Sequence, residues 1–234
     1  MNILEKAISV AVNLHSGQTD KKGEPYILHP LRVMNDPELV EGIEGQQERD
    51  FVRAVAVLHD TLEDCDIGRK ALEYQLSVTV NAEASAIAME VETLSKREDE
   101  KGFKGYLRFV ERVKKSTDTA RRVKLADIRD NSNPARLEYL DESTRHYLQK
   151  KYGAALHAMG ERIRREGWED GPDGDYLYGS PDDGAGVYYE MNEWRYVLSY
   201  PGHDVSGVGP FNTAIDAMVD VENRLKELRQ SPAS

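Results

Sequence analysis

The sequence has little cysteine and no long apolar run. Its 234 residues include one cysteine, Cys65, so an internal disulfide is excluded. A lone cysteine fits a reducing compartment, and its expected role is that of a small buried apolar side chain. The first residues mix charged groups into an amphipathic pattern, and no segment approaches the roughly 18 apolar residues of a membrane span. We therefore expect a cytoplasmic protein that does not act in a membrane.

The sequence also lacks an excess of positive charge. The formal net charge is −11, and residues 166–234 account for most of it, with 14 Asp and Glu against 4 Lys and Arg. Nucleic-acid binding needs a basic face, so this composition speaks against a nucleic-acid partner. Residues 1–165 are close to neutral, with 27 Lys and Arg and 28 Asp and Glu. This part can hold a local basic pocket for a small anion.

Helical periodicity runs through the first part of the chain. Pro30 suits the first turn of a helix, where its missing N–H costs nothing, and the NSNP stretch is a clear stop. No segment up to residue 165 has a convincing strand pattern, so we expect an all-helical first domain of residues 1–165. Its expected helices are 2–15, one beginning near residue 29, 46–64, 68–77, 82–96, 104–116, 119–131 and 141–165.

The composition changes after Gly167. Residues 168–186 are rich in Gly, Pro and Asp and predict a linker or loop. Residues 186–202 have the aromatic and β-branched content of strands, and a final amphipathic helix is expected after Asn212 or Thr213. We therefore predict a mainly α protein: a helical bundle followed by a small acidic β-β-α appendage over 166–234. The sequence leaves open whether the appendage binds a protein partner or a second copy of the chain.

Four polar side chains cluster at the end of an otherwise apolar helix, in the stretch AVLHDTLEDC (56–65). On a helical wheel, they form a face of their own beside the apolar stripe: His59, Asp60, Glu63 and Asp64. Ionised side chains are rarely buried unless they are paired or bind a metal. A solvated acidic face would explain Glu63 and Asp64 equally well. This helix alone therefore does not decide whether the four side chains form a metal site.

Two other stretches supply groups of the same kind. GEPYILHP places His29 where a loop meets a helix, and RRVKLADIRDN places Lys124, Asp127 and Asn131 on one helix face. Two histidines and two aspartates from three helices would form a mixed nitrogen and oxygen site. Such a ligand set suits manganese, iron or zinc better than calcium or magnesium. The groups can converge only in a folded bundle.

In the order H…HD…D, these stretches resemble the HD-domain metal-dependent phosphohydrolases, in particular the hydrolase domain of RelA/SpoT-type enzymes and the small alarmone hydrolases. The resemblance covers about residues 1–160 and implies an HD-domain helical bundle. Enzymes of this family remove the 3′-diphosphate of (p)ppGpp, giving GDP or GTP and pyrophosphate, usually with Mn²⁺. The resemblance implies that the attacking water is ordered by Glu63 and Asp64 and that the metal is bound by His29, His59, Asp60 and Asp127.

The resemblance also implies which side chains line the nucleotide pocket. Asn131 and Lys124 would do so, and Lys21 and Arg121 are further candidates for contacts with base or phosphate. The family commonly carries a basic residue that packs on the guanine, whereas Asp20 stands near that position here. An HD phosphohydrolase acting on another nucleotide is therefore an alternative, with an adenosine alarmone, NADPH or a nucleoside mono- or triphosphate as substrate. A third hypothesis is a regulatory protein that senses an alarmone or a partner through the appendage.

Overall fold

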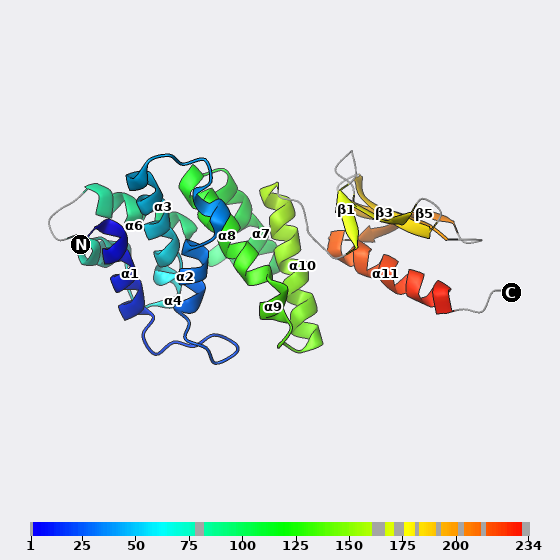
Figure 1. Ribbon diagram of the computed structural model, residues 1–234, viewed down its shortest axis with the longest axis horizontal. Helices are drawn as coiled ribbons and strands as arrows, with labels where there is room; N and C mark the ends of the chain where they lie inside the picture. The colour runs from blue at the N-terminus through cyan, green and yellow to red at the C-terminus, as the bar shows by residue number, and fades with distance from the viewer. Residues whose placement is uncertain are drawn as a thin grey trace. The chain divides into compact units, whose positions relative to one another are not determined.

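The computed structural model describes residues 2–77, 82–160, 167–170, 176–180, 183–190, 193–200, 204–211 and 214–230. The chain divides into two compact units, Met1–Leu140 and Asp141–Ser234, and most of their elements are labelled in Figure 1. Among the described helices, none combines the length and the apolar character needed to cross a lipid bilayer.

The described part of the first unit is helical, apart from one isolated bridge between Thr19 and Pro25. Short 3₁₀ turns occupy Pro37–Val40 and Glu98–Glu100. The α-helices are α1 (Ile3–Leu14), α2 (Leu28–Met34), α3 (Gln46–Leu58), α4 (Thr61–Asp64), α5 (Arg69–Leu76), α6 (Ala82–Leu94), α7 (Gly102–Lys114), α8 (Asp118–Ser132) and α9 (Pro134–Leu137).

Helix α3 is the central helix of this unit. It packs against α1, α2, α6 and α8, and every residue at its C-terminal end, from Ala54 to Leu58, is buried. A helix that is apolar on all sides belongs in a core, because each buried Val or Leu side chain contributes about 1.5–3 kcal/mol. The core therefore holds α2 and α8, the helices that carry His29 and Asp127, against the C-terminal end of α3.

The predicted continuous helix over residues 46–64 is wrong in one place. α3 ends at Leu58 and α4 begins at Thr61, so His59 and Asp60 form a link between two helices. The Thr61 hydroxyl donates to the Leu58 carbonyl at 2.7 Å and closes this turn. Asp60 has φ −96° and ψ −5°, a sparsely populated backbone region in which active-site residues are often found. A helical wheel that treats residues 46–64 as one straight helix therefore gives wrong directions for Glu63 and Asp64 of α4.

The second unit contains a five-stranded antiparallel sheet in the described residues, with the strand order β1-β2-β3-β4-β5. Helix α11 lies along one face of this sheet (Figure 1). Val187, Trp194 and Tyr196 form a buried cluster with Met218 and Val221 of α11. The elements are α10 (Glu142–Met159), β1 (Trp168–Asp170), β2 (Tyr176–Ser180), β3 (Asp183–Glu190), β4 (Glu193–Ser199), β5 (Val205–Phe211) and α11 (Ala214–Gln230).

The sheet has more strands than the two that the sequence predicts. The segment predicted as a linker contributes β1 and β2, because its backbone groups pair antiparallel with the next strands, with Tyr178 opposite both Trp168 and Ala185. Glycine and aspartate are poor strand formers, and tertiary pairing overrides that tendency here. The predicted cap of the last helix, Asn212 or Thr213, lies outside the described residues.

Helix α10 belongs to the second compact unit. The units divide between Leu140 and Asp141, whereas the sequence-based division follows residue 165. α10 packs against α11, and the Lys150 ammonium lies 3.1 Å from an Asp216 carboxylate oxygen. The His157 ring lies edge-on to Trp194, with 4.8 Å between the ring centroids. The two divisions therefore differ by one helix.

The burial of α3 leads to a stability prediction. Leu58 is fully buried, at 0% exposure, so Leu58→Ala should lower the free energy of unfolding by about 2–5 kcal/mol through lost contacts and a cavity. Chemical denaturation measures this change. Tyr74→Ala is the control, because Tyr74 is 81% exposed and its loss should cost less than about 0.5 kcal/mol. Equal midpoints for Leu58→Ala and the unsubstituted protein would contradict the assignment of α3 to the core.

Candidate metal centre

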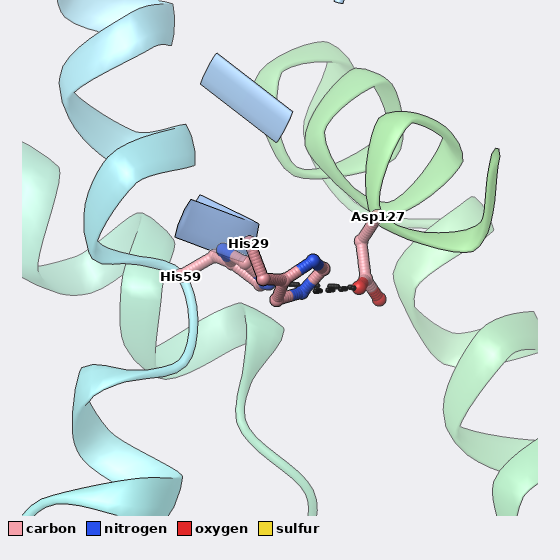
Figure 2. Close-up of side chains that lie close together, drawn as sticks. All are labelled: His29, His59 and Asp127. Carbon is pink, nitrogen blue, oxygen red and sulfur yellow. Dashed lines mark ion pairs between the residues drawn. The ribbon is translucent and has the colours of Figure 1, made fainter. Parts of the chain in front are cut away.

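Three side chains that are far apart in the sequence converge in the first unit. His29 lies on α2, His59 follows α3 and Asp127 lies on α8. One nitrogen or oxygen of each lies within 4.8 Å of the others (Figure 2). The Asp127 Oδ1 atom is 3.3 Å from His29 Nε2 and 3.6 Å from His59 Nε2. All three side chains are buried, and together they could hold a divalent metal ion.

The hydrogen bonds of His59 fit such an ion. Its Nδ1 atom lies 2.8 Å from the Ala56 carbonyl, and because a carbonyl only accepts, Nδ1 carries the hydrogen. In the neutral ring, Nε2 then presents a lone pair. This buried nitrogen has no hydrogen-bond partner among the described residues, although a carboxylate oxygen of Asp60 lies 3.0 Å away. A lone pair that faces carboxylates is unfavourable unless a cation or a proton lies between them.

A proton takes that place in the metal-free chain. Burial alone would lower the pKa of His59, but the nearby Asp60 and Asp127 carboxylates raise it to about 9. Burial also works against protonation of His29, whose hydrogen bonds to Asp127, Asp130 and Asp60 raise its pKa to about 11. A metal ion must displace these protons, so metal binding is coupled to proton release.

Asp60 lies beside the three converging residues. Its Oδ2 atom is 3.5 Å from His29 Nε2 and accepts the Tyr26 hydroxyl at 2.6 Å. The structure therefore brings the four predicted metal ligands together, with the tightest group formed by His29, His59 and Asp127. A ligand role for Asp60 stays a prediction.

Two predicted substrate-binding residues hold Asp127 in place. Lys124 donates to Asp127 Oδ2 at 2.7 Å, and Asn131 donates to Oδ1. The Lys124 ammonium is buried and lies over the rings of Tyr106 and Phe109. Burial alone would lower the pKa of Lys124, but the Asp127 carboxylate outweighs it and raises the pKa. In this arrangement, Lys124 is the counterion of Asp127 rather than an open phosphate contact.

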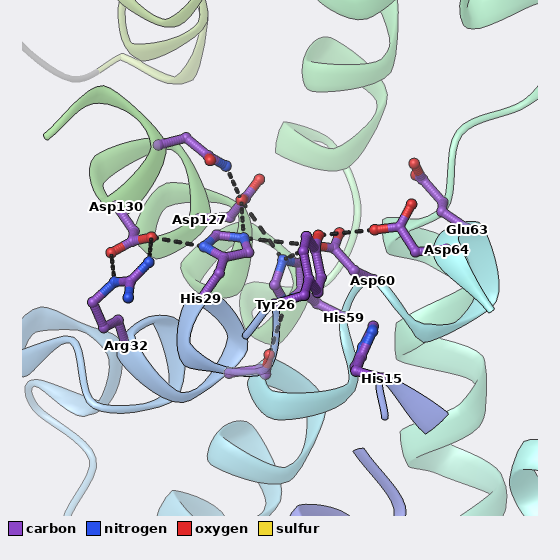
Figure 3. Close-up of polar contacts among 12 residues, drawn as sticks. His15, Tyr26, His29, Arg32, His59, Asp60, Glu63, Asp64, Asp127 and Asp130 are labelled. Carbon is purple, nitrogen blue, oxygen red and sulfur yellow. Dashed lines mark hydrogen bonds and ion pairs between the residues drawn. The ribbon is translucent and has the colours of Figure 1, made fainter. Parts of the chain in front are cut away.

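Asp130 is a site residue that the sequence motifs did not single out. Its carboxylate lies 2.7 Å from His29 Nδ1, so His29 donates to it and turns Nε2 towards the cluster (Figure 3). Arg32 donates to the same carboxylate at 2.7 Å, and Arg136 also contacts it. Burial would raise the pKa of Asp130, but these partners hold it at about 2. Its position one turn after Asp127, on the same face of α8, was the available signal.

Asp64 points towards Asp60 and shares its partner (Figure 3). The Tyr26 hydroxyl lies 2.8 Å from Asp64 Oδ2 and 2.6 Å from Asp60 Oδ2. A hydroxyl has one hydrogen, so Tyr26 shares it between the two carboxylates. Burial and the charge of Asp60 raise the pKa of Asp64. Asp64 therefore lies in a more acidic-rich and more buried environment than a carboxylate in water, beside the proposed metal ligand Asp60.

Glu63 lies next to Asp64 on the single turn of α4, but its carboxylate has different partners. The backbone N–H of Lys96 donates to Glu63 Oε1 at 2.7 Å, and the Lys96 ammonium donates to Oε2. The two predicted water-activating acids therefore differ in environment. Asp64 faces the converging histidines and aspartates, and Glu63 is held from the side of α6.

The other two predicted substrate contacts lie apart from the cluster. Lys21 is exposed in the loop between α1 and α2. Arg121 is half-exposed and pairs with Asp118. Arg121 precedes Asp127 by six residues on α8, or about 9 Å along the helix axis. Neither side chain contacts the converging residues.

The loop between α1 and α2 is shaped by Asp20. Its carboxylate accepts the backbone N–H groups of Lys22 and Glu24 at 2.8 and 3.1 Å. The Lys22 ammonium donates to the Ala135 carbonyl at 2.9 Å and lies 3.8 Å from the centroid of the Tyr139 ring. Asp20 therefore stabilises a turn that presents Lys22, rather than Lys21, to the segment after α8.

A solved structure has a similar fold. It is that of a metazoan ortholog of SpoT that hydrolyzes ppGpp and plays a role in starvation responses, and it matches with a TM-score of 0.50 and 21% identity. The match covers 67% of this chain and 86% of that one. At this identity the likeness shows a shared fold, which confirms the mainly helical fold predicted from the three sequence stretches.

Curated proteins match shorter parts of the chain. The guanosine-3′,5′-bis(diphosphate) 3′-pyrophosphohydrolase of Vibrio cholerae is 30% identical over 128 residues, which is 54% of this chain and 15% of that protein. A GTP pyrophosphokinase of Myxococcus xanthus is 35% identical over 97 residues, which is 41% of this chain and 11% of that protein. The chain thus spans less than a sixth of the length of these relatives. No family model matches the chain.

The contact between Asp130 and His29 predicts an effect on metal affinity. Loss of a carboxylate that orients a ligating histidine typically costs about 10–100-fold in affinity, so Asp130→Asn should weaken Mn²⁺ binding by that factor. Titration calorimetry on metal-free protein measures it. Asp118→Asn is the matched control on the same helix, because Asp118 is exposed and pairs with Arg121 and Arg122. Unchanged affinity in Asp130→Asn would show that His29 does not depend on this contact.

The raised histidine pKa values predict how the stability of the metal-free protein varies with pH. A group whose pKa is higher in the folded than in the unfolded state contributes stability that is complete below the unfolded value, about 6.5, and is lost as the pH rises through the folded value. For His59 that folded value is about 9. Thermal unfolding in a chelator should therefore show falling stability between pH 6.5 and 9, and His59→Gln should flatten this slope. His146→Gln, a control outside the cluster, should keep it.

Proposed function

We propose that this chain is a metal-dependent hydrolase that removes the 3′-diphosphate of (p)ppGpp, with Mn²⁺ as its metal. One observation carries the proposal: two imidazoles and a carboxylate from three distant parts of the chain meet where a buried imidazole nitrogen has no hydrogen-bond partner among the described residues. Donors of this kind, gathered away from water, suit a divalent transition metal. Asp60 is the fourth proposed ligand.

The names of the relatives cover two reactions. One relative is named as a pyrophosphohydrolase and the other as a pyrophosphokinase, and the protein with the similar structure, a metazoan ortholog of SpoT, hydrolyzes ppGpp. The chemistry of the site favours hydrolysis for this chain, because carboxyl groups that can take a proton from water lie beside the proposed metal ligands. Asp64, close to Asp60 through Tyr26, is one of them.

The proposed reaction adds water across the bond between the ribose 3′ oxygen and its diphosphate, which gives a 3′-hydroxyl and pyrophosphate. When bound, a divalent ion supplies positive charge for the phosphate oxygens and makes a neighbouring water more acidic. Glu63 and Asp64 are assigned the ordering and deprotonation of the attacking water. Lys124 and Asn131 keep Asp127 in its orientation, and Asp130 does the same for His29.

A second substrate class is supported by the loop between α1 and α2. Asp20 stands near the position where the family commonly carries a basic residue that packs on guanine, and its carboxylate accepts backbone hydrogen bonds of the loop. Lys22 and Tyr139 form the cationic and aromatic pair nearby, and such a pair stacks on any base. An adenosine 3′,5′-bis(diphosphate) is therefore the second candidate substrate.

The proposed function predicts pyrophosphate release. Purified protein loaded with Mn²⁺ should convert ppGpp to GDP and pyrophosphate. Anion-exchange chromatography of the nucleotides measures this conversion. Glu63→Gln should lower kcat by about 10²–10⁴-fold, the usual contribution of a general base, and should leave Mn²⁺ binding intact. Glu98→Gln is the control, because Glu98 is exposed and pairs with Lys101.

Two results would change this assignment. Failure to release pyrophosphate at any loading with Mn²⁺, Fe²⁺, Co²⁺ or Zn²⁺ would remove the hydrolase proposal. Faster hydrolysis of the adenosine than of the guanosine bis(diphosphate) would keep the chemistry and replace the substrate.

A further inference from the structure

The carboxylate of Glu63 is held by a single residue, Lys96, that lies just after α6. Both groups of Lys96 that can donate are used: the backbone N–H bonds to Oε1 at 2.7 Å and the ammonium bonds to Oε2. The Glu63 side chain is 20% exposed and that of Lys96 is 37% exposed. Exposed ion pairs usually contribute little, but here Glu63 is only partly exposed and the pair is reinforced by a backbone hydrogen bond.

The two donors fix how the carboxylate is turned. The terminal torsion of a glutamate is broad when nothing constrains it, and α4 is a single turn of four residues that contacts α6. Donors on both oxygens set the plane of the Glu63 carboxylate from the side of α6. Each oxygen has a second acceptor position, so one lone pair on each stays available to water.

The segment that carries Lys96 is itself anchored. Arg112 of α7 donates to the Thr93 and Ser95 carbonyls at 2.8 and 2.9 Å. Its guanidinium also pairs with the buried carboxylate of Glu100, and Glu100 in turn accepts the backbone N–H of Arg97 at 2.8 Å. The chain is therefore fixed on both sides of Lys96.

We propose that Lys96 is a positioning residue for hydrolysis: it orients the Glu63 carboxylate towards the attacking water from an anchor built by Arg112 and Glu100. This inference rests on the proposed function, because it gives Lys96 a role only through the base that it holds. A different reading would make the ammonium of Lys96 a direct contact for a substrate phosphate, and the two readings predict different kinetics.

A double-mutant cycle separates these readings. Lys96→Met removes the ammonium and keeps the backbone hydrogen bond, and we expect kcat for ppGpp to fall about 10–100-fold, as for a small misplacement of a catalytic group. KM and Mn²⁺ affinity of Lys96→Met should stay within about 3-fold of the values of the unsubstituted protein. Lys96→Arg, which keeps the charge, should retain most of kcat. In the Glu63→Gln background, Lys96→Met should change kcat by less than about 2-fold, because the carboxylate that Lys96 orients is gone and both hydrogen bonds of Lys96 are to Glu63 rather than to Asp64.

Lys115→Met is the matched control, because Lys115 is 79% exposed and pairs with Glu111. Lys96→Gln serves as a second variant if Lys96→Met does not fold, as judged by thermal unfolding. An unchanged kcat in the Lys96 variants would overturn the positioning role while the hydrolase proposal stands. So would a rise in KM on Lys96→Met that is equal in the unsubstituted and the Glu63→Gln backgrounds. An inactive unsubstituted protein would instead remove both proposals.

Discussion

The nitrogen lone pair of His59, buried opposite the carboxylates of Asp60 and Asp127, is the interaction around which the first unit is organised. Such an arrangement is repulsive without positive charge, and Lys124 does not supply it at that point, since it binds the other oxygen of Asp127. A proton or a metal ion must therefore complete the core. Binding of the ion and stability of the bundle are two aspects of the same electrostatic requirement.

The contacts of Asp130 balance the negative charge next to His29. Asp130 is bounded by His29, Arg32 and Arg136, so the site alternates anionic and cationic groups from α8 outwards to α2 and α9. Buried ion pairs of this kind add little stability by themselves. Their value lies in holding the imidazole in one orientation, which is the property a metal site needs.

Much of the helical unit could be predicted from the sequence, and the reasons for the misses are local. The approach of His29, His59 and Asp127 was implied by the family resemblance of three sequence motifs. Amphipathic periodicity indicates which face of each helix is buried but does not say which distant segments meet. The break between Leu58 and Thr61 could not be predicted in this way, since apolar and polar residues keep the helical period across it. Strands β1 and β2 were missed because the segment that contains them, residues 168–186, is rich in glycine, proline and aspartate, which are typical of turns; the pairing of β1 with β2 and of β2 with β3 makes them strands.

The placement of α10 affects how the chain can be shortened. A cut after residue 165 would keep this helix but remove Trp194 and α11, against which it packs within its own unit. Leu148, Ala155 and Met159 are buried in the intact chain, and apolar side chains stripped of their cover promote self-association. A cut after Leu140 follows the division between the compact units and keeps every residue of the candidate metal centre, so it is the sounder end point for an isolated fragment of the first unit.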